Sequence, residues 1–298
     1  MNMFKDTLKN ILTKGLLTIE EELARRRICL ALDDRDVDNT RRLIAELTPY
    51  VGMFKIGPVL YTASYNQGIN FINEINAIKR STFIDLKLHD TPNTVYEASQ
   101  ELVVPGVYMF NVHVAGAKNM IKGGIKGEEM IKGALQGRDE GFHKLLMKLK
   151  EERQRQFSFF DTSNNYIPPK PMVIGVTELT SVTNEDLLSQ GITIKYNDLV
   201  RKRTELAREW GLDGIVCPAS QAGALEKEFG SDFLYVTPGI KWKGVYREGQ
   251  QHVYTPDQAV RDCKNSILVI GGAITKHKTP EERKRVAYEI IQAMAKEL

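Results

Sequence analysis

The chain is organised around Phe83-Ile84-Asp85-Leu86-Lys87-Leu88-His89-Asp90-Thr91-Pro92-Asn93-Thr94-Val95. Its first half alternates with period two, which in a β-strand places Asp85 and Lys87 on one face and apolar side chains on the other. Asp90 follows where the apolar run ends, and Thr91-Pro92 indicates a loop because proline cannot continue a central strand. The stretch predicts a carboxylate, an ammonium and a second carboxylate gathered at the carboxyl end of one strand.

Two interpretations of these charges are open, a structural ion pair and a catalytic lysine. Taking unlike charges out of water costs free energy for each ion and rarely stabilises a core, which disfavours a purely structural pair. Carboxylates at Asp85 and Asp90, on both sides of Lys87, favour the protonated ammonium. This pattern is typical of a proton donor whose acceptor appears only in the transition state.

Short apolar or β-branched runs recur along the chain with helical segments between them. We expect eight strands, at Ile28–Leu32, Gly52–Ile56, Thr82–Leu88, Val107–Val112, Met172–Val176, Gly214–Cys217, Phe233–Val236 and Ile267–Ile270. The clearest helix start is Thr279-Pro280-Glu281-Glu282, where threonine, proline and the second glutamate form a capping box.

Strict alternation of strands and helices favours an α/β fold of the (β/α)₈ TIM-barrel class over an open doubly wound sheet. We expect a single barrel domain over residues 1–298, with an N-terminal extension that forms an outer helix. Residues 118–170 are longer than the connection between strands four and five requires. Within them, Lys144–Arg153 has a narrow apolar stripe in a basic run, which predicts a solvated amphipathic insertion helix.

Composition excludes several classes of function. The net charge of +3 is small beside 41 basic and 38 acidic residues, so no nucleic-acid-binding face is expected. No apolar run reaches membrane-spanning length, and residues 1–14 lack the apolar core of a secretory signal. Three distant cysteines in apolar runs, Cys29, Cys217 and Cys263, predict reduced buried thiols and a cytoplasmic protein.

Polar residues and glycines stand at the ends of six of the expected strands, where a barrel carries its active site. They are Asp33, Lys55 with Gly57, the Asp85–Asp90 group, Thr177 to Ser181, Thr237 to Ile240, and Gly271 with Gly272. Glycines after the seventh and eighth strands are typical of phosphate binding through backbone N–H groups. We therefore expect these residues to converge on one site.

Asp85-x-Lys87-x-x-Asp90 followed by Pro92-Asn93-Thr94-Val95 resembles the signature of the orotidine 5'-phosphate decarboxylase family. The resemblance covers about residues 28–280 outside the insertion. The other matching blocks, in chain order, are Ala31-Leu32-Asp33, Lys55-Ile56-Gly57, Val112-His113-Val114-Ala115-Gly116, Gly211-Leu212-Asp213-Gly214 and Val236-Thr237-Pro238-Gly239-Ile240.

The resemblance implies that Lys87 protonates C6 of the pyrimidine, that Asp85 sits against the departing carboxylate and that Lys55 completes the charge array. It further implies a homodimer, in which catalytic Asp90 and substrate-binding Thr94 reach the ribose across the interface. The other substrate-binding residues that it implies are Asp33 at the ribose, Thr180 and Ser181 at the pyrimidine, Pro238, and Gln250, Gly271 and Gly272 at the phosphate.

The chain departs from the family pattern at the phosphate. The family usually has Ile-Gly-Arg-Ser after its last strand, whereas this chain reads Ile270-Gly271-Gly272-Ala273, so the phosphate-binding arginine is missing. Where many bacterial members have arginine after Pro-Gly-Ile, this chain has Lys241, and Thr91 replaces the customary isoleucine. The cations available to compensate at the phosphate are Lys241, Lys243, Arg247 and Lys276.

The histidines His89, His113, His143, His252 and His277 lack metal-ligand spacing, and no dinucleotide or P-loop fingerprint is present. We expect neither a metal nor a cofactor. Two other functions remain open. One is a related magnesium-dependent sugar-phosphate decarboxylase or aldolase, which holds its ion partly through an acid where this chain has Lys55. The other is a non-catalytic nucleotide-binding barrel.

Overall fold

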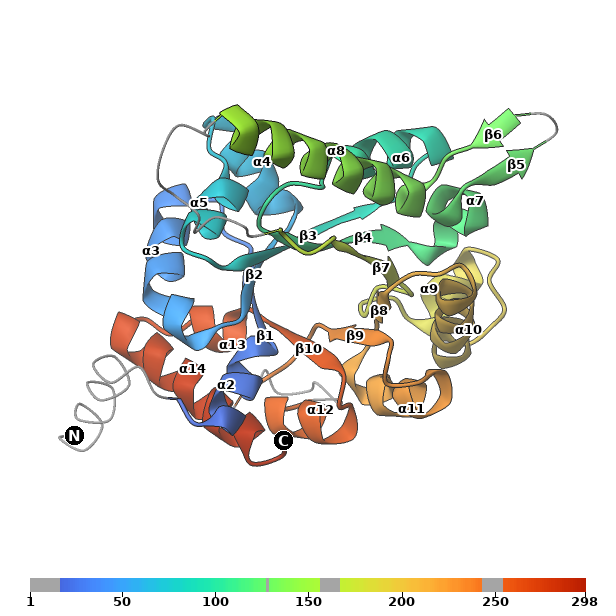
Figure 1. Cartoon of the computed structure of the whole chain (residues 1–298). Helices are drawn as coiled ribbons and strands as arrows, with labels where there is room; N and C mark the ends of the chain where they lie inside the picture. The colour runs from blue at the N-terminus through green and yellow to red at the C-terminus, as the bar shows by residue number, and fades with distance from the viewer. Residues whose placement is uncertain (1–16, 127–128, 156–166, 243–253) are drawn as a thin grey trace.

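The computed structural model describes residues 17–126, 129–155, 167–242 and 254–298. Eight parallel strands close into a barrel in the order β1-β10-β9-β8-β7-β4-β3-β2 (Figure 1). They are β1 (Ile28–Leu32), β2 (Met53–Ile56), β3 (Ser81–Leu88), β4 (Val107–His113), β7 (Met172–Val176), β8 (Gly214–Val216), β9 (Leu234–Thr237) and β10 (Ser266–Ile270). The predicted TIM-barrel class is confirmed, and each predicted strand boundary lies within one residue of the observed one.

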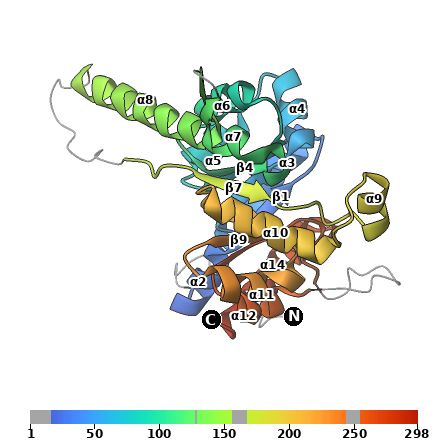
Figure 2. The ribbon, with the colours of Figure 1, turned by 90° about the vertical axis from the view of Figure 1, so that its right-hand side faces the viewer.

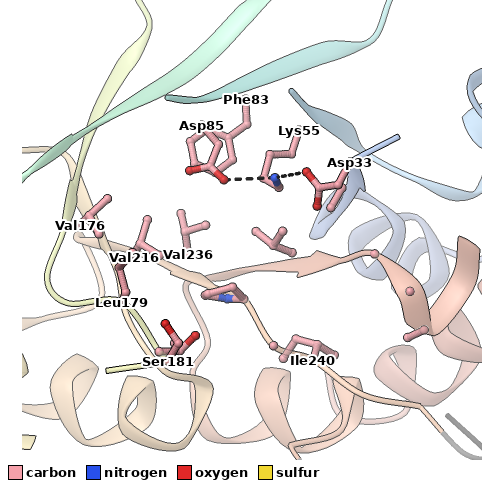
Figure 3. Close-up of a pocket in the computed structure, with 18 of the residues that line it drawn as sticks. Asp33, Lys55, Phe83, Asp85, Val176, Leu179, Ser181, Val216, Val236 and Ile240 are labelled. Atoms are coloured by element: carbon pink, nitrogen blue, oxygen red, sulfur yellow. Dashed lines mark hydrogen bonds and ion pairs between the residues drawn. The ribbon is translucent and has the colours of Figure 1, made fainter. Parts of the chain in front are cut away.

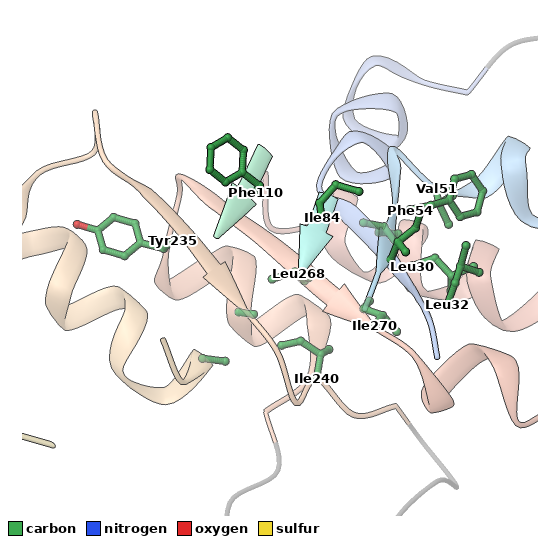
Figure 4. Close-up of a cluster of buried hydrophobic side chains, with 14 of the residues drawn as sticks. Leu30, Leu32, Val51, Phe54, Ile84, Phe110, Tyr235, Ile240, Leu268 and Ile270 are labelled. Carbon is green, nitrogen blue, oxygen red and sulfur yellow. The ribbon is translucent and has the colours of Figure 1, made fainter. Parts of the chain in front are cut away.

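The strands read as continuous apolar runs because both faces of a parallel barrel are buried. One face packs inside the barrel, in a cluster that includes Cys29, Ala31, Phe83 and Val269. The other face packs against the surrounding helices, as Leu30, Phe54, Ile84, Phe110 and Leu268 do in Figure 4. This alternation leaves the carboxyl ends of the strands free to carry polar side chains.

Helices connect the strands and cover the outside of the barrel (Figure 1). They are α3 (Val37–Leu47), α4 (Pro58–Asn66), α5 (Phe71–Ala77), α6 (Pro92–Glu101), α7 (Ala117–Lys122), α8 (Ala134–Arg155), α9 (Asn184–Ser189), α10 (Tyr196–Glu209), α11 (Ala219–Phe229), α12 (Pro256–Asp262), α13 (Gly272–Thr275) and α14 (Pro280–Ala295). The described connections also contain two short 3₁₀ turns, η1 (Thr48–Tyr50) and η2 (Val114–Gly116).

The predicted capping box at the start of α14 is confirmed. Thr279 Oγ1 accepts a hydrogen bond from Glu282 N at 3.2 Å, and Glu282 Oε2 accepts one from Thr279 N at 3.2 Å. The predicted outer helix of the N-terminal extension corresponds to α2 (Ile19–Arg26), which packs on α14. Residues 1–16 of this extension lie outside the described residues.

The connection between β4 and β7 contains the predicted helix, but the helix is longer than its amphipathic stretch. α8 begins at Ala134, ten residues before that stretch, and its first half packs on α6 rather than standing in solvent. Close approach requires glycine here, since a Cβ at Gly137 would lie 2.3 Å from Tyr96 O and one at Gly141 2.9 Å from Gln100 O. Figure 2 shows the other half of α8 extending beyond the barrel.

A two-stranded antiparallel hairpin precedes α8, formed by β5 (Gly124–Lys126) and β6 (Glu129–Ile131). The sequence did not predict it, since each strand has only three residues and no alternating pattern reaches detectable length. No helix in the described part of the chain combines the length and apolar character needed to cross a membrane.

Cys29, Cys217 and Cys263 are free and buried, as predicted. Burial raises the pKa of the Cys263 thiol to about 12, with a further contribution from Glu226. It also raises the pKa values of the Cys29 and Cys217 thiols. All three groups therefore pack as small apolar side chains at neutral pH.

Candidate active site

A cavity of about 670 Å³ opens at the carboxyl ends of the strands, within the usual range for small-molecule sites. Nine of the predicted site residues line it: Asp33, Lys55, Asp85, Lys87, Thr180, Ser181, Pro238, Gly271 and Gly272. They come from β2 and β3 and from the segments after β1, β7, β9 and β10. The structure thus brings together residues that are up to 239 positions apart, from Asp33 to Gly272.

Two predicted residues do not reach this cavity. Asp90 and Thr94 are exposed, at the junction of β3 and α6, and they do not line it. Asp90 Oδ1 accepts a hydrogen bond from Thr91 N at 2.6 Å, and the Thr91 and Thr94 hydroxyl oxygens are 2.8 Å apart. Gln250 lies outside the described residues.

The charged side chains form one continuous chain of alternating sign, Asp33–Lys55–Asp85–Lys87. Lys55 Nζ lies 2.9 Å from Asp33 Oδ1 and 3.1 Å from Asp85 Oδ2, and Lys87 Nζ lies 2.7 Å from Asp85 Oδ1. Figure 3 shows the two Lys55 contacts on one side of the cavity, with Ser181 and Ile240 across from them. Gly57 leaves room for the Asp33–Lys55 pair, since a Cβ there would be 3.1 Å from both charged atoms.

In this row of charges, the two middle side chains, Lys55 and Asp85, are buried, and the two at its ends are more exposed. The side chains of Lys55 and Asp85 are 9% and 12% exposed, whereas those of Lys87 and Asp33 are 29% and 56% exposed. Burial by itself lowers the pKa of Lys55, but the carboxylates of Asp85 and Asp33 more than offset it, so this pKa lies above its ordinary value. Lys55 is therefore a fixed positive charge at neutral pH.

Asn111, in the middle of β4, is a site residue that the sequence analysis missed. Its side chain is buried, and its Nδ2 donates to Asp85 Oδ1 at 2.7 Å. Its Oδ1 accepts a hydrogen bond from the backbone N–H of Lys87, also at 2.7 Å. One amide thus fixes both the Asp85 carboxylate and the backbone that carries Lys87.

The backbone at Lys87 is unusual, with φ of 54° in the left-handed region that non-glycine residues rarely adopt. The register between β3 and β4 shifts there, because Ile84 pairs with Phe110 but Leu88 pairs with Val112. Asp85 and Lys87 lie within this bulge. Such strain costs about 1–3 kcal/mol and persists where surrounding contacts fix it, which is typical of functional sites.

Glu178, two residues after β7, also lines the cavity, as expected for the Thr177–Ser181 segment, although the sequence indicated no specific role for it. It forms an ion pair with Arg203 of α10, and both side chains are nearly buried. The same guanidinium donates to Thr177 O at 2.6 Å. Arg203 therefore holds the start of the segment that carries Thr180 and Ser181.

The cavity and its surroundings offer little to a metal ion. Within the described ranges, no group of three or more His, Cys, Asp or Glu side chains is arranged to hold one. His89 and His113 pack on each other with ring centroids 5.4 Å apart, and burial lowers the pKa of His113. At the end of β2, the position of a metal-binding acid is held by the ammonium of Lys55.

We expect Asn111→Leu to lower the free energy of unfolding by about 2–4 kcal/mol, because it leaves the partly buried Lys87 N–H unpaired and removes one donor from the buried Asp85. Denaturant titration followed by circular dichroism measures this change. Asn73→Leu, on the exposed face of α5, is the control and should stay within about 0.5 kcal/mol of wild type. Equal stability of the two variants would contradict the role of Asn111.

Comparison with known proteins identifies relatives over most of the chain. The family model described as orotidine 5'-phosphate decarboxylase / HUMPS matches residues 26–286. A Coxiella burnetii protein named orotidine 5'-phosphate decarboxylase is 34% identical over 254 residues, 85% of this chain and 92% of that protein. A Moorella thermoacetica protein of the same name is 34% identical over 269 residues, covering 90% and 93%.

Solved structures agree with these relatives. The orotidine 5'-phosphate decarboxylase of Lactobacillus acidophilus superposes with a TM-score of 0.64 at 26% identity, over 90% of this chain and 98% of that one. The family match spans most of the chain, and both bacterial relatives are 34% identical to it over at least 85% of its length. The chain belongs to the orotidine 5'-phosphate decarboxylase / HUMPS family.

Proposed function

We propose that the protein decarboxylates orotidine 5'-monophosphate to uridine 5'-monophosphate, the last step of de novo pyrimidine nucleotide biosynthesis. The observation that carries this proposal is the alternating Asp33–Lys55–Asp85–Lys87 chain at the wall of the cavity. Membership of the family and the names of the relatives support it. The enzyme is a carboxy-lyase.

Loss of carbon dioxide from orotate leaves a carbanion in an sp² orbital that no carbonyl group can delocalise. Stabilisation must therefore come from a fixed positive charge, and a proton must be supplied nearby. Lys87 fits both tasks, because it lies at an exposed end of the charge chain and lines the cavity. In this proposal Lys87 stabilises the carbanion and then protonates C6.

Asp85 acts on the departing carboxylate. Its two oxygens accept contacts from Lys55, Lys87 and Asn111, and all three of these groups are donors. A fixed anion beside the substrate carboxylate disfavours the ground state more than the transition state. Contacts to the phosphate and ribose, remote from the reacting carbon, supply the binding energy that this requires.

The remaining cavity residues are assigned to the substrate by the family resemblance. Asp33, the exposed end of the charge chain, binds ribose hydroxyls, and Thr180 with Ser181 binds the pyrimidine edge. Pro238, Gly271 and Gly272 surround the phosphate end, and Gln250 belongs there by resemblance.

We place the active protein in the cytoplasm as a homodimer. The exposed position of Asp90 and Thr94, away from the cavity of their own chain, supports a role in the partner's site. The three free buried thiols support a reducing compartment. A magnesium-dependent reaction is less favoured, because the Lys55 ammonium opposes a cation at the end of β2. A non-catalytic barrel is less favoured because the whole charge chain is present.

We expect the purified protein to decarboxylate orotidine 5'-monophosphate at an undiminished rate in the presence of a chelator, since the reaction needs only the protein's own charges. The fall in ultraviolet absorbance of the substrate measures turnover. Activity that disappears with chelator and returns with magnesium would favour the sugar-phosphate type of site. Absence of turnover in both conditions would refute the decarboxylase proposal.

Lys87→Ala should remove nearly all turnover while the protein stays folded. The fold should survive because Asp85 keeps Lys55 and Asn111 as partners. Steady-state rates and a circular-dichroism melt measure the two effects separately. Lys148→Ala, on the exposed half of α8, is the control and should keep full activity. A folded Lys87→Ala protein with near-normal turnover would eliminate the mechanism.

Lys87→Ala and Asp90→Ala chains, each nearly inactive alone, should complement when mixed. A mixed dimer has one site that combines an intact Lys87 with the partner's intact Asp90, so random exchange should restore about a quarter of wild-type activity. Rates before and after mixing at equal concentrations measure this, with exchange shown by native mass spectrometry. Lack of recovery despite exchange would argue for sites built from one chain.

A further inference from the structure

The phosphate end of the cavity has two lysines of the described chain, Lys241 and Lys276, beside Gly239, Gly271 and Gly272. The other two lysines of the cavity, Lys55 and Lys87, are already paired with carboxylates. Neither Lys241 nor Lys276 forms an ion pair with any residue in the described ranges. The cavity thus contains uncommitted positive charge away from the Asp–Lys chain.

Lys276 is distinguished from Lys241 by its relation to Gly272. A Cβ built on Gly272 would lie 2.9 Å from Lys276 Cε, 3.1 Å from its Cδ and 3.4 Å from its Cγ. The aliphatic part of Lys276 therefore runs through the space that any side chain at position 272 would enter. The backbone reinforces this arrangement, since Lys276 N donates to Gly272 O across α13.

The side chain of Lys276 and any side chain at residue 272 would occupy the same space next to the cavity. Any side chain at residue 272 would displace the lysine, and glycine at residue 272 allows the lysine to lie there. Gly272 has a backbone that other residues can adopt, since its φ is not in the left-handed region. A side chain at residue 272 would therefore meet the Lys276 side chain rather than a backbone restriction.

We infer that Lys276, lying over Gly272, is the cation that binds the 5'-phosphate and sets the preference for a phosphorylated nucleoside. This inference rests on the proposed function. Lys241 also lines the cavity, but the three atoms nearest a Cβ at Gly272 all belong to Lys276. A lysine ammonium is a compact charge that contacts a dianion from one direction, so its loss should weaken binding without altering the charge chain at the reacting carbon.

The test is calorimetric binding of uridine 5'-monophosphate and of uridine to wild type, Lys276→Ala, Lys241→Ala and Lys278→Ala. Lys276→Ala should weaken nucleotide binding about ten- to a hundredfold and leave uridine binding unchanged, as expected for a lost charge-assisted contact. Lys278→Ala is the matched control, an exposed lysine two residues on that does not line the cavity. It should bind both compounds as wild type does.

A second set of variants tests the shared volume. Gly272→Ala should weaken nucleotide binding when Lys276 is present and have no effect in a Lys276→Ala background, because there is then nothing to displace. Gly272→Arg should restore nucleotide binding to Lys276→Ala, since the guanidinium enters the vacated space. If the effects of Gly272→Ala and Lys276→Ala on nucleotide binding were additive in the double variant, the inference would be overturned.

Binding without turnover separates this inference from the proposed function. A wild type that prefers the nucleotide through Lys276 but does not decarboxylate orotidine 5'-monophosphate would refute the decarboxylase and retain the phosphate ligand. A decarboxylase in which Lys276→Ala leaves the nucleotide preference intact, or in which Lys241→Ala is the damaging change, would overturn the inference alone. Equal binding of nucleotide and nucleoside by wild type would also overturn it.

Discussion

The buried carboxylate of Asp85 is the constraint on which the site depends. A charge with a side chain 12% exposed is costly unless every lone pair is used, and its donors come from three neighbouring strands: Lys55 of β2, Lys87 of β3 and Asn111 of β4. Removing one partner of a buried pair typically costs about 3–5 kcal/mol. The register of these three strands and the position of the Asp85 carboxylate are therefore linked. A shift in the register of one strand would leave an unpaired ion in the barrel.

The same set of contacts maintains the bulge at Lys87. A flat strand would carry its pairing with β4 past residue 84, whereas here the register shifts and Lys87 adopts a φ of 54°. The Asn111 amide satisfies the N–H that this bulge removes from the ladder. The strained backbone of Lys87 and the hydrogen bond that satisfies its N–H thus involve the same residue pair, Lys87 and Asn111. The bulge orients the Lys87 side chain differently from a side chain on a regularly pleated strand.

The sequence predicted the barrel and most of the cavity because both follow from local patterns. Apolar runs mark strands buried on both faces, and polar residues after them must gather at one rim. Asn111 escaped prediction because one amide within an apolar strand resembles an ordinary buried polar residue, and its partners are 24 and 26 positions away. The extent of α8 was missed for a similar reason, since Gly137 and Gly141 weaken a helix by propensity and are explained only by the backbone of α6.

The two ends of the cavity differ in how readily their residues can be substituted. Four charges in contact at 2.7–3.1 Å fix one another, so no member of the Asp–Lys chain can move without unpairing a neighbour. A phosphate dianion is different, because a long side chain can bring a positive charge to it from several backbone positions. Phosphate contacts contribute binding energy at a distance from the reacting carbon. The total binding energy matters more than which residues supply the individual contacts. A side chain one helical turn from residue 272, such as Lys276, can therefore bring positive charge to this end of the cavity while the contacts of the Asp–Lys chain stay unaltered.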